Sequence, residues 1–222
     1  MDSIKKTPWD KAAFGIDTYE LETVSIDTLK AVKSKPGHYT VRVKPLESAN
    51  LLHEAGFYYC DTLLQPYCTR EMLKSYDDKK VKVVKGNDLE LLFEICHGAF
   101  RYGRFHRDPY IRNSDADNRY DEWLRDLYRK KKVFELRYDG NIAGFIGVED
   151  NSLVLHAVAE KYRGRGLAKY LWSALCEELF SNGYTELYSS ISATNTAALN
   201  LYISLGFRIR NAIDIYHYLN KG

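Results

Sequence analysis

The pattern of apolar and polar positions changes period between residues 151 and 183. Residues 152–158 form a short run rich in Val and Leu, which is typical of a strand covered on both faces. From Leu167 onward, apolar residues recur at the spacing of one buried helical stripe, and Gly183 stands where a left-handed C-terminal cap is expected. The pattern therefore predicts a strand that passes through a short turn into a helix.

The same two periods alternate along the rest of the chain, so the sequence predicts a mixed α/β fold. Asp139-Gly140 is typical of a tight hairpin turn between two of the strands. The pattern predicts strands through residues 16–24, at 40–44, 58–60, 81–85, 133–138, 141–148 and 186–191, and from Phe207 and Ile213; it predicts helices at 47–55 and from Asn87 or Asp88 and from Asp115.

These elements fall into two groups. Residues 70–80 are polar and charged, which suits a surface connection between a first lobe, residues 1–75, and a second domain, residues 81–222. The heptapeptide LLHEAGF at 51–57 echoes LYISLGF at 201–207. We interpret the first lobe as a partial copy of the end of the second domain, with chance similarity over seven residues as the alternative.

Composition and charge limit the classes of function. A hydrophobic content of 45% is enough for a packed core, and 32 basic against 30 acidic residues give a net charge of +2. This charge creates no field that recruits nucleic acid or an anionic membrane. No segment approaches the roughly twenty apolar residues of a spanning helix, and the N-terminus lacks an apolar signal region. We therefore expect a cytoplasmic protein without a nucleic-acid or membrane partner.

The four cysteines favour a reducing compartment. None of them has Cys-x-x-Cys spacing, and they lie in otherwise apolar segments. We expect buried free thiols, with no disulfide and no metal site. The cysteines are Cys60, Cys68, Cys96 and Cys176.

The turn between the predicted strand and helix at 152–183 has the features of an anion site. Gly164 and Gly166 remove side chains, so backbone N–H groups can approach a phosphate, and the helix that follows presents unpaired N–H groups. Arg163 and Arg165 add positive charge. The spacings of a P-loop and of a dinucleotide fold are absent. An ordinary glycine-containing turn is the alternative to a pyrophosphate site.

A second motif lies downstream. Asn195 can cap a helix in which Ala198 and Tyr202 share a face, and Gly206 can end that helix. Arg-x-x-Gly-x-Ala at 163–168 and Asn-x-x-Ala-x-x-x-Tyr-x-x-x-Gly-Phe at 195–207 together resemble the signatures of the GNAT superfamily of acetyl-CoA-dependent N-acetyltransferases. The resemblance implies a GNAT fold of the α/β (α+β) class, with a central mixed twisted sheet flanked by helices and an N-terminal partial GNAT-like lobe.

The GNAT resemblance also implies roles for individual residues. Tyr202 becomes the general acid that protonates the departing thiolate, with a purely structural core tyrosine as the alternative. Backbone groups at Ala157 and Val158 polarise the thioester and hold the pantetheine. The residues implied to bind acetyl-CoA are Ala157, Val158, Arg163, Gly164, Arg165, Gly166, Leu167, Ala168 and Asn195.

A closer resemblance covers nearly the whole chain. Trp9, Phe14, the 51–57 segment and the loop at Arg104 with Tyr120 beyond it are similar to the dTDP-fucosamine acetyltransferase family. This similarity implies acetylation of a nucleotide-linked (dTDP) 4-amino-deoxy sugar, by direct transfer in a ternary complex. The chain departs from that family just before the acid tyrosine, where Leu201 replaces an Arg, so contact with CoA at that position is in doubt.

A general base is needed because only a neutral amine attacks. His156 on the predicted strand is the best titratable candidate, since the unperturbed pKa of a histidine side chain is about 6.5. A packed, hydrogen-bonded histidine is the alternative, and Glu149 and Asp150 are weaker candidates. The strand position where the superfamily often places a basic residue holds Ser152.

The loop at 101–111, RYGRFHRDPYI, is dense in Arg, His and aromatic residues. Arg104 and Arg107 can pair with a substrate diphosphate while an aromatic ring stacks on the base or sugar. We therefore predict Arg104, His106 and Tyr110 as substrate-binding residues. A solvated basic loop over the core is the alternative.

Two other functions stay open at this point. The chain can be a GNAT enzyme that acts on a protein N-terminus or a polyamine, or a binding module that keeps the CoA cleft without catalysis. The presence of Tyr202 argues against the inactive module, and the basic loop argues against a polyamine. The sequence leaves a homodimer open as the assembly.

Overall fold

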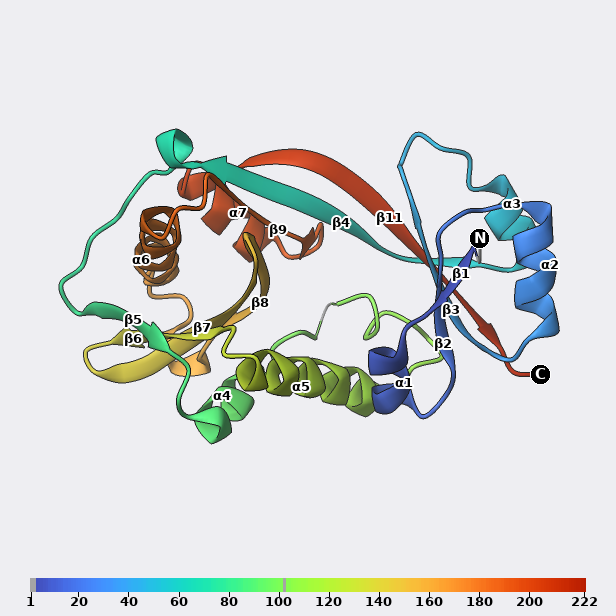
Figure 1. Cartoon of the computed structure of the whole chain (residues 1–222), viewed down its shortest axis with the longest axis horizontal. Helices are drawn as coiled ribbons and strands as arrows, with labels where there is room; N and C mark the ends of the chain where they lie inside the picture. The colour runs from blue at the N-terminus through green and yellow to red at the C-terminus, as the bar shows by residue number, and fades with distance from the viewer. Residues whose placement is uncertain (1–2, 102) are drawn as a thin grey trace.

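The computed structural model describes residues 3–101 and 103–222. Within them, one mixed sheet runs in the order β1-β2-β3-β11-β4-β9-β8-β7-β6-β5, with β10 paired to β4, and helices flank it (Figure 1). The strands are β1 (Ile4–Lys6), β2 (Thr18–Leu21), β3 (Gly37–Val43), β4 (Tyr58–Thr69), β5 (Val81–Lys85), β6 (Val133–Tyr138), β7 (Asn141–Glu149), β8 (Ser152–Val158), β9 (Glu186–Ser189), β10 (Ile191–Ser192) and β11 (Arg208–Asn220). The α-helices are α1 (Pro8–Phe14), α2 (Ile26–Ser34), α3 (Asn50–Ala55), α4 (Leu89–Cys96), α5 (Asn113–Arg129), α6 (Ala168–Ser181) and α7 (Thr196–Ser204).

The predicted strand, turn and helix at 152–183 are confirmed as β8 and α6. Leu171, Leu175 and Leu179 form the buried stripe of α6, and Gly183 has a φ of +99°, as a left-handed position beyond a helix requires. The predicted cap of α7 is also confirmed, because the side chain of Asn195 accepts a hydrogen bond from the Ala198 N–H at 3.1 Å. The mixed α/β class follows from these units.

The first lobe contains two helices that the sequence pattern missed. Pro8 starts α1, which is a favourable first position for proline. Ser25 starts α2 through a capping box with Thr28, in which each side chain bonds the other residue's backbone N–H. The strand expected through residues 16–24 was too long, since only β2 is extended. The Ser25-to-Thr28 spacing was the local signal for the second helix, although threonine replaces the usual acid or amide.

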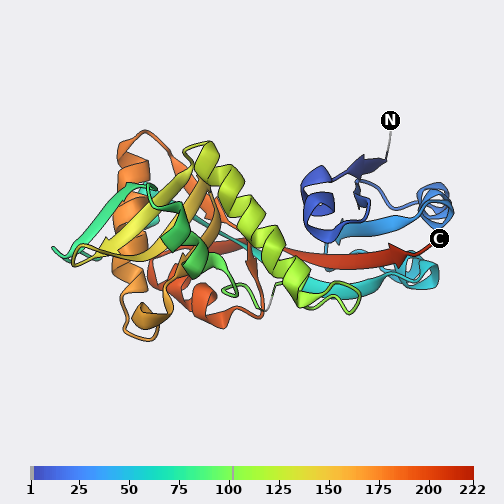
Figure 2. The same cartoon turned by 90° about the horizontal axis from the view of Figure 1, so that it is seen from below.

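The expectation of two strands from Phe207 and Ile213 was wrong. A single 13-residue strand, β11, passes through a bulge, because Ile209 faces Pro66 on β4 while Asn211 faces the next residue, Gln65. This strand pairs with β4 along one edge and with β3 along the other. Figures 1 and 2 show β4 and β11 running together along the molecule. The division of the chain into a first lobe (1–75) and a second domain (81–222) stays a prediction. The single sheet contains strands from both parts.

The two faces of the sheet carry different helices. Phe145 of β7 packs in the core under α4 and α5, whereas its neighbour Ile146 packs in the core under α6 and α7. This alternation follows the period of a strand, in which successive side chains point to opposite faces. A third core, formed by the first lobe together with β11, includes Tyr39, Leu52 and Tyr216. The segments that lead into α6 and that join α4 to α5 therefore lie on opposite faces.

Gly206 occupies a position at which the fold leaves no space for a side chain. Its φ is +89°, and a Cβ atom added there would collide with the carbonyl oxygen of Met72. Gly206→Ala should lose about 1–2 kcal/mol of unfolding free energy to the left-handed backbone and about 1–3 kcal/mol more to the collision. Gly140→Ala is the matched control, since Gly140 has a φ of +81° and open space around it. Equal losses in denaturant titrations of the two variants would contradict the collision.

Candidate active site

A fork in the sheet forms the centre of the site. β8 and β9 pair at only two positions, Ser152 with Tyr188 and Leu153 with Ser189. β8 then continues to Val158, while the chain beyond β9 forms β10 and pairs with β4. In the described part of the chain, the edge of β8 beyond Leu153 therefore has no strand partner on this side. Such an edge can pair with an extended ligand as a further strand would.

Val158 directs its backbone into this fork. The Ala159 N–H donates to the Ala143 carbonyl of β7 at 2.8 Å, and successive residues of a strand turn their polar groups to opposite edges. The Val158 carbonyl accordingly faces away from β7 and accepts a hydrogen bond from Arg163 Nε at 2.8 Å. The Val158 N–H points the same way and is available to a ligand. Ala157 turns its backbone polar groups to β7 instead.

Tyr202 and His156 meet at the fork. The Tyr202 hydroxyl lies 3.0 Å from His156 Nε2, and the side chain of Tyr202 is completely buried. Ser189 ends β9 beside them, with its hydroxyl 3.5 Å from the same nitrogen and donating to the Leu153 carbonyl at 2.7 Å. The structure thus brings the two predicted catalytic residues together.

Burial sets the protonation of this pair. It raises the pKa of Tyr202 above the usual range, so the hydroxyl keeps its proton at neutral pH. Burial also lowers the pKa of His156 to about 4, so the imidazole is neutral. The Tyr202 hydroxyl donates to His156 Nε2 in the tautomer that carries the imidazole proton on Nδ1. Tyr202 therefore holds a proton that it can give up.

The predicted phosphate turn is open and left-handed at both glycines. Gly164 and Gly166 have φ values of +71° and +70°, and an added Cβ atom would meet nothing within 4 Å at either position. Leu167 is the N-cap of α6 and offers no side-chain acceptor, so the first N–H groups of that helix remain for another acceptor. Arg163 and Arg165 are exposed beside them. These features fit a phosphate or pyrophosphate.

The other two predicted contacts with acetyl-CoA lie at helix starts. Ala168 is the first residue of α6, directly after the turn. Asn195 is exposed and uses its side-chain oxygen to cap α7, the helix that carries Tyr202. Its amide group remains free for a ligand, while its first role is to fix the start of α7.

Arg104 lies in the loop between α4 and α5, which is hydrogen-bonded to β3, β4 and β11. Its guanidinium stacks over the Phe105 ring at 4.5 Å, and its buried Nη1 has no hydrogen-bond partner among the described residues. Burial lowers the pKa of Arg104 to about 10, and the charge of Arg42 acts in the same direction. A buried cation without a partner is costly, which makes Arg104 the residue of this loop best suited to an anion.

His106 and Tyr110 occupy different surroundings. The His106 ring is largely buried, bonds Asp117 at 3.1 Å through Nε2 and stacks parallel to Tyr120. Tyr110 is 53% exposed and lines a surface recess that also contains Lys221. None of the contacts described for His106 and Tyr110 is with Tyr202 or His156. Their predicted roles in substrate binding stay predictions.

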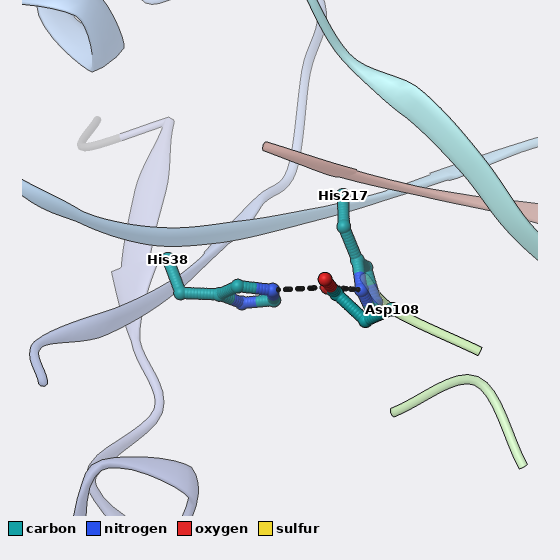
Figure 3. A group of neighbouring side chains, drawn as sticks. All are labelled: His38, Asp108 and His217. Atoms are coloured by element: carbon teal, nitrogen blue, oxygen red, sulfur yellow. Dashed lines mark hydrogen bonds and ion pairs between the residues drawn. The ribbon is translucent and has the colours of Figure 1, made fainter. Parts of the chain in front are cut away.

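Asp108 anchors this loop and was missed from the sequence. Its Oδ2 atom lies 2.8 Å from His38 Nε2 and 2.7 Å from His217 Nδ1 (Figure 3). Its Oδ1 atom accepts from the Tyr58 hydroxyl at 3.0 Å and from the Tyr110 N–H at 2.9 Å. Burial opposes ionisation of Asp108, but the hydrogen bonds from His217 and His38 outweigh it and hold its pKa well below the usual range. The Asp108 carboxylate is therefore charged, and burial lowers the pKa of His217, so this imidazole is neutral and donates through Nδ1.

The same three side chains have donor atoms of a kind that metals bind. In residues 3–101 and 103–222, His38, Asp108 and His217 form the one such group whose ligand atoms lie within 4.8 Å of one another. The hydrogen bonds pair His38 Nε2 and His217 Nδ1 with Asp108 Oδ2, whereas the buried His217 Nε2 has no partner among the described residues. The expectation of a protein without a metal site stays a prediction.

Residues 93–207 match the model of the Acetyltransferase (GNAT) family. The spore coat polysaccharide biosynthesis protein SpsD of Bacillus subtilis (strain 168) is 23% identical over 136 residues, which are 59% of this chain and 47% of that protein. The ribosomal protein bS18-alanine N-acetyltransferase of Escherichia coli (strain K12) is 31% identical over 108 residues, which are 47% of this chain and 68% of that protein.

The chain spans less than half of the length of several of these relatives. The match covers 29% of the N-acetylaspartate synthetase of Rattus norvegicus, which is 36% identical over 90 residues.

Solved structures share the fold. The GCN5-related N-acetyltransferase from Sphaerobacter thermophilus has a TM-score of 0.59 at 15% identity, covering 84% of this chain and 61% of that one. A tandem GNAT protein from the clavulanic acid biosynthesis pathway has a TM-score of 0.58 at 10% identity, covering 92% of this chain and 76% of that one. Separately, no helix in the described part of the chain combines the length and apolar content that a membrane span requires.

Gly166→Asp tests the phosphate turn. Aspartate tolerates a positive φ better than most residues and space is available, so the variant should stay folded, while its carboxylate repels the pyrophosphate. We expect affinity for CoA to fall by about 100-fold or more in isothermal titration, equivalent to about 2.7 kcal/mol. Gly166→Asn is the control of matched shape without the charge and should lose less. Normal CoA affinity in a folded Gly166→Asp protein would remove the turn from the binding site.

Proposed function

The chain belongs to the GNAT family of acetyltransferases, and on that premise we propose that it acetylates the amino group of a nucleotide-linked 4-amino-deoxy sugar. The observation that carries the proposed mechanism is the un-ionised Tyr202 hydroxyl, 3.0 Å from His156 at the fork between β8 and β9. A buried phenol that holds its proton at neutral pH is suited to protonate a leaving thiolate.

Acetyl-CoA supplies an activated acetyl group, and the chain has a place for each part of it. The turn from Arg163 to Ala168 would hold the pyrophosphate through its N–H groups and arginines. The free edge of β8 would hold the pantetheine, with the Val158 N–H oriented toward the thioester oxygen. The fork then places the leaving sulfur beside Tyr202, and orientation of the two substrates supplies much of the rate.

Direct transfer is favoured over an acyl-enzyme. All four cysteines are buried, and burial raises the pKa of Cys60 to about 12 and that of Cys68 to about 11. Burial also raises the pKa of Cys96 and Cys176 well above the usual range. Thiols of this kind form little thiolate at neutral pH and are poor nucleophiles. Both substrates would therefore be bound together.

Three observations support an amino-sugar nucleotide as the acceptor. In the loop between α4 and α5, the buried Nη1 atom of the half-buried Arg104 has no hydrogen-bond partner among the described residues, and a substrate phosphate can pair with it. The first lobe, which resembles that of the dTDP-fucosamine acetyltransferases, packs against the same loop through Asp108. One relative is named for polysaccharide biosynthesis. We place the reaction in the cytoplasm, where free thiols persist.

A protein N-terminus is the second candidate acceptor. It is favoured by the 31% identity to an enzyme named for acetylating the alanine of a ribosomal protein. A polyamine fits less well, because the candidate acceptor loop carries Arg104 and Arg107 rather than a set of unpaired acids.

The decisive assay ranks acceptors and then removes the acid. Wild-type protein with acetyl-CoA is offered a dTDP-4-amino-4,6-dideoxyhexose, the free amino sugar, a peptide beginning with alanine and a polyamine. We expect the nucleotide sugar to have the highest kcat/KM, with the free sugar weaker because it lacks the phosphates that Arg104 would bind. Turnover of the peptide or the polyamine in preference to the nucleotide sugar would overturn the acceptor assignment.

On the best acceptor, Tyr202→Phe should lose about 10²- to 10⁴-fold in kcat. Its CoA affinity should change little, because the hydroxyl acts on charge that develops in the transition state. The ring fills the same buried volume, so thermal unfolding checks that the fold is retained. A folded variant with kcat within about threefold of wild type would show that Tyr202 is only a core residue, well short of a general-acid contribution.

A further inference from the structure

Asp61 is a completely buried aspartate on β4 whose two carboxylate oxygens differ in their hydrogen bonding. Its Oδ1 accepts three hydrogen bonds: from the Thr62 N–H at 2.9 Å, the Ser192 hydroxyl at 2.8 Å and Arg107 Nη1 at 3.1 Å. Its Oδ2 is buried and has no partner among the described residues. One oxygen is thus fixed in place, and the other keeps all of its lone pairs.

This asymmetry indicates a ligand. A buried polar atom without a partner costs about 1–3 kcal/mol, and more when it is charged, so Oδ2 gains strongly from a donor that brings positive charge. An alkylammonium group is such a donor, with three N–H groups and a unit charge. A carboxylate held rigidly through Oδ1 can bind an ammonium through Oδ2 and then accept one of its protons.

Asp61 lies within reach of the fork. Ser192, which donates to Asp61, follows Ser189 by three residues, and Ser189 lies 3.5 Å from His156 Nε2. Three residues span at most about 11 Å even when fully extended. Asp61 and the pair formed by Tyr202 and His156 therefore flank the same short segment, residues 189–192.

We propose that Asp61 binds the acceptor's ammonium group through Oδ2 and acts as the general base of the reaction. This inference rests on the acetyltransferase function proposed above. The sequence gives no motif for it, because the contacts of Asp61 join β4 to residues 46 and 131 positions away.

The protons balance as follows. Asp61 takes one proton from the ammonium, which leaves a neutral amine. The amine nitrogen forms the bond to the acetyl carbonyl carbon, and the bond from that carbon to sulfur breaks. Tyr202 gives its proton to the thiolate and takes back the second proton of the amine. The products are the amide, a free thiol and a protonated Asp61, which releases its proton to solvent.

The surroundings of Asp61 suit this role. The charged and titratable groups that face it are Arg104 and Arg107 from the loop, Tyr120 from α5 and Cys60 from β4. Burial raises the pKa of Asp61, while the hydrogen bond from Ser192 and the charge of Arg107 act against the rise. The carboxylate is therefore a stronger base than an exposed aspartate.

Asp61→Asn separates this role from a structural one. Asparagine keeps an oxygen for the three donors to Oδ1 and removes only the charge and the basic oxygen. Asp214→Asn is the matched control. Asp214 lies on the neighbouring β11 and, like Asp61, accepts a hydrogen bond from Thr62. The Ser192 hydroxyl, which connects Asp61 to the fork, donates to Asp61 and has no described contact with Asp214. Both variants are compared with wild type by thermal unfolding, CoA titration and kcat/KM from pH 6 to pH 9, on whichever amine the wild type acetylates best.

We expect Asp61→Asn to keep its unfolding temperature and CoA affinity and to lose about 10²- to 10⁴-fold in kcat/KM at pH 7. The loss should shrink about tenfold for each unit of rising pH below the pKa of the amine, because the variant depends on amine that is already neutral. Asp214→Asn should stay within about threefold of wild type, far from a general-base loss.

Three outcomes would overturn the proposal. One is an Asp61→Asn protein with near-normal kcat/KM at pH 7, another is a loss that does not change with pH, and the third is an unfolding temperature that falls in step with activity. The proposed acceptor fails separately, if wild type prefers another amine; Asp61→Asn is then judged on that amine.

Discussion

One buried carboxylate ties the acceptor side of the molecule together. Asp108 comes from the loop between α4 and α5, and its partners His38, Tyr58 and His217 come from β3, β4 and β11. Removing one partner from a buried charge costs about 3–5 kcal/mol, so the loop is held firmly to the sheet. The position of Arg104, four residues earlier, depends on this anchor. His38 of β3 and Tyr58 of β4 thereby help to position this loop.

The two substrates are assigned to opposite faces of the sheet. The phosphate turn leads into α6 on one face, and the acceptor loop joins α4 to α5 on the other. On this proposed assignment, they would meet at the fork between β8 and β9, with Tyr202 beside it. A geometry of this kind lets both substrates be bound at once. No side chain of the protein then has to carry the acetyl group as a covalent intermediate.

Local patterns predicted the elements that we propose to bind acetyl-CoA better than those that we propose to bind the acceptor. The strand, turn and helix at 152–183 and the cap at Asn195 depend on neighbouring residues, and the sequence was enough to find them. Asp61 and Asp108 owe their surroundings to residues 46 to 131 positions away, so no spacing marks them. The bulge that makes β11 a single strand likewise depends on pairing with β4.

The central claim is that transfer occurs directly between two substrates bound together, and initial-rate kinetics test it most directly. Wild-type rates are measured over a grid of acetyl-CoA and acceptor concentrations, and intact-protein mass spectrometry follows the enzyme with acetyl-CoA alone. The account predicts double-reciprocal lines that intersect and a protein that remains unacetylated. Parallel lines together with an acetylated protein would indicate a covalent ping-pong route and contradict it.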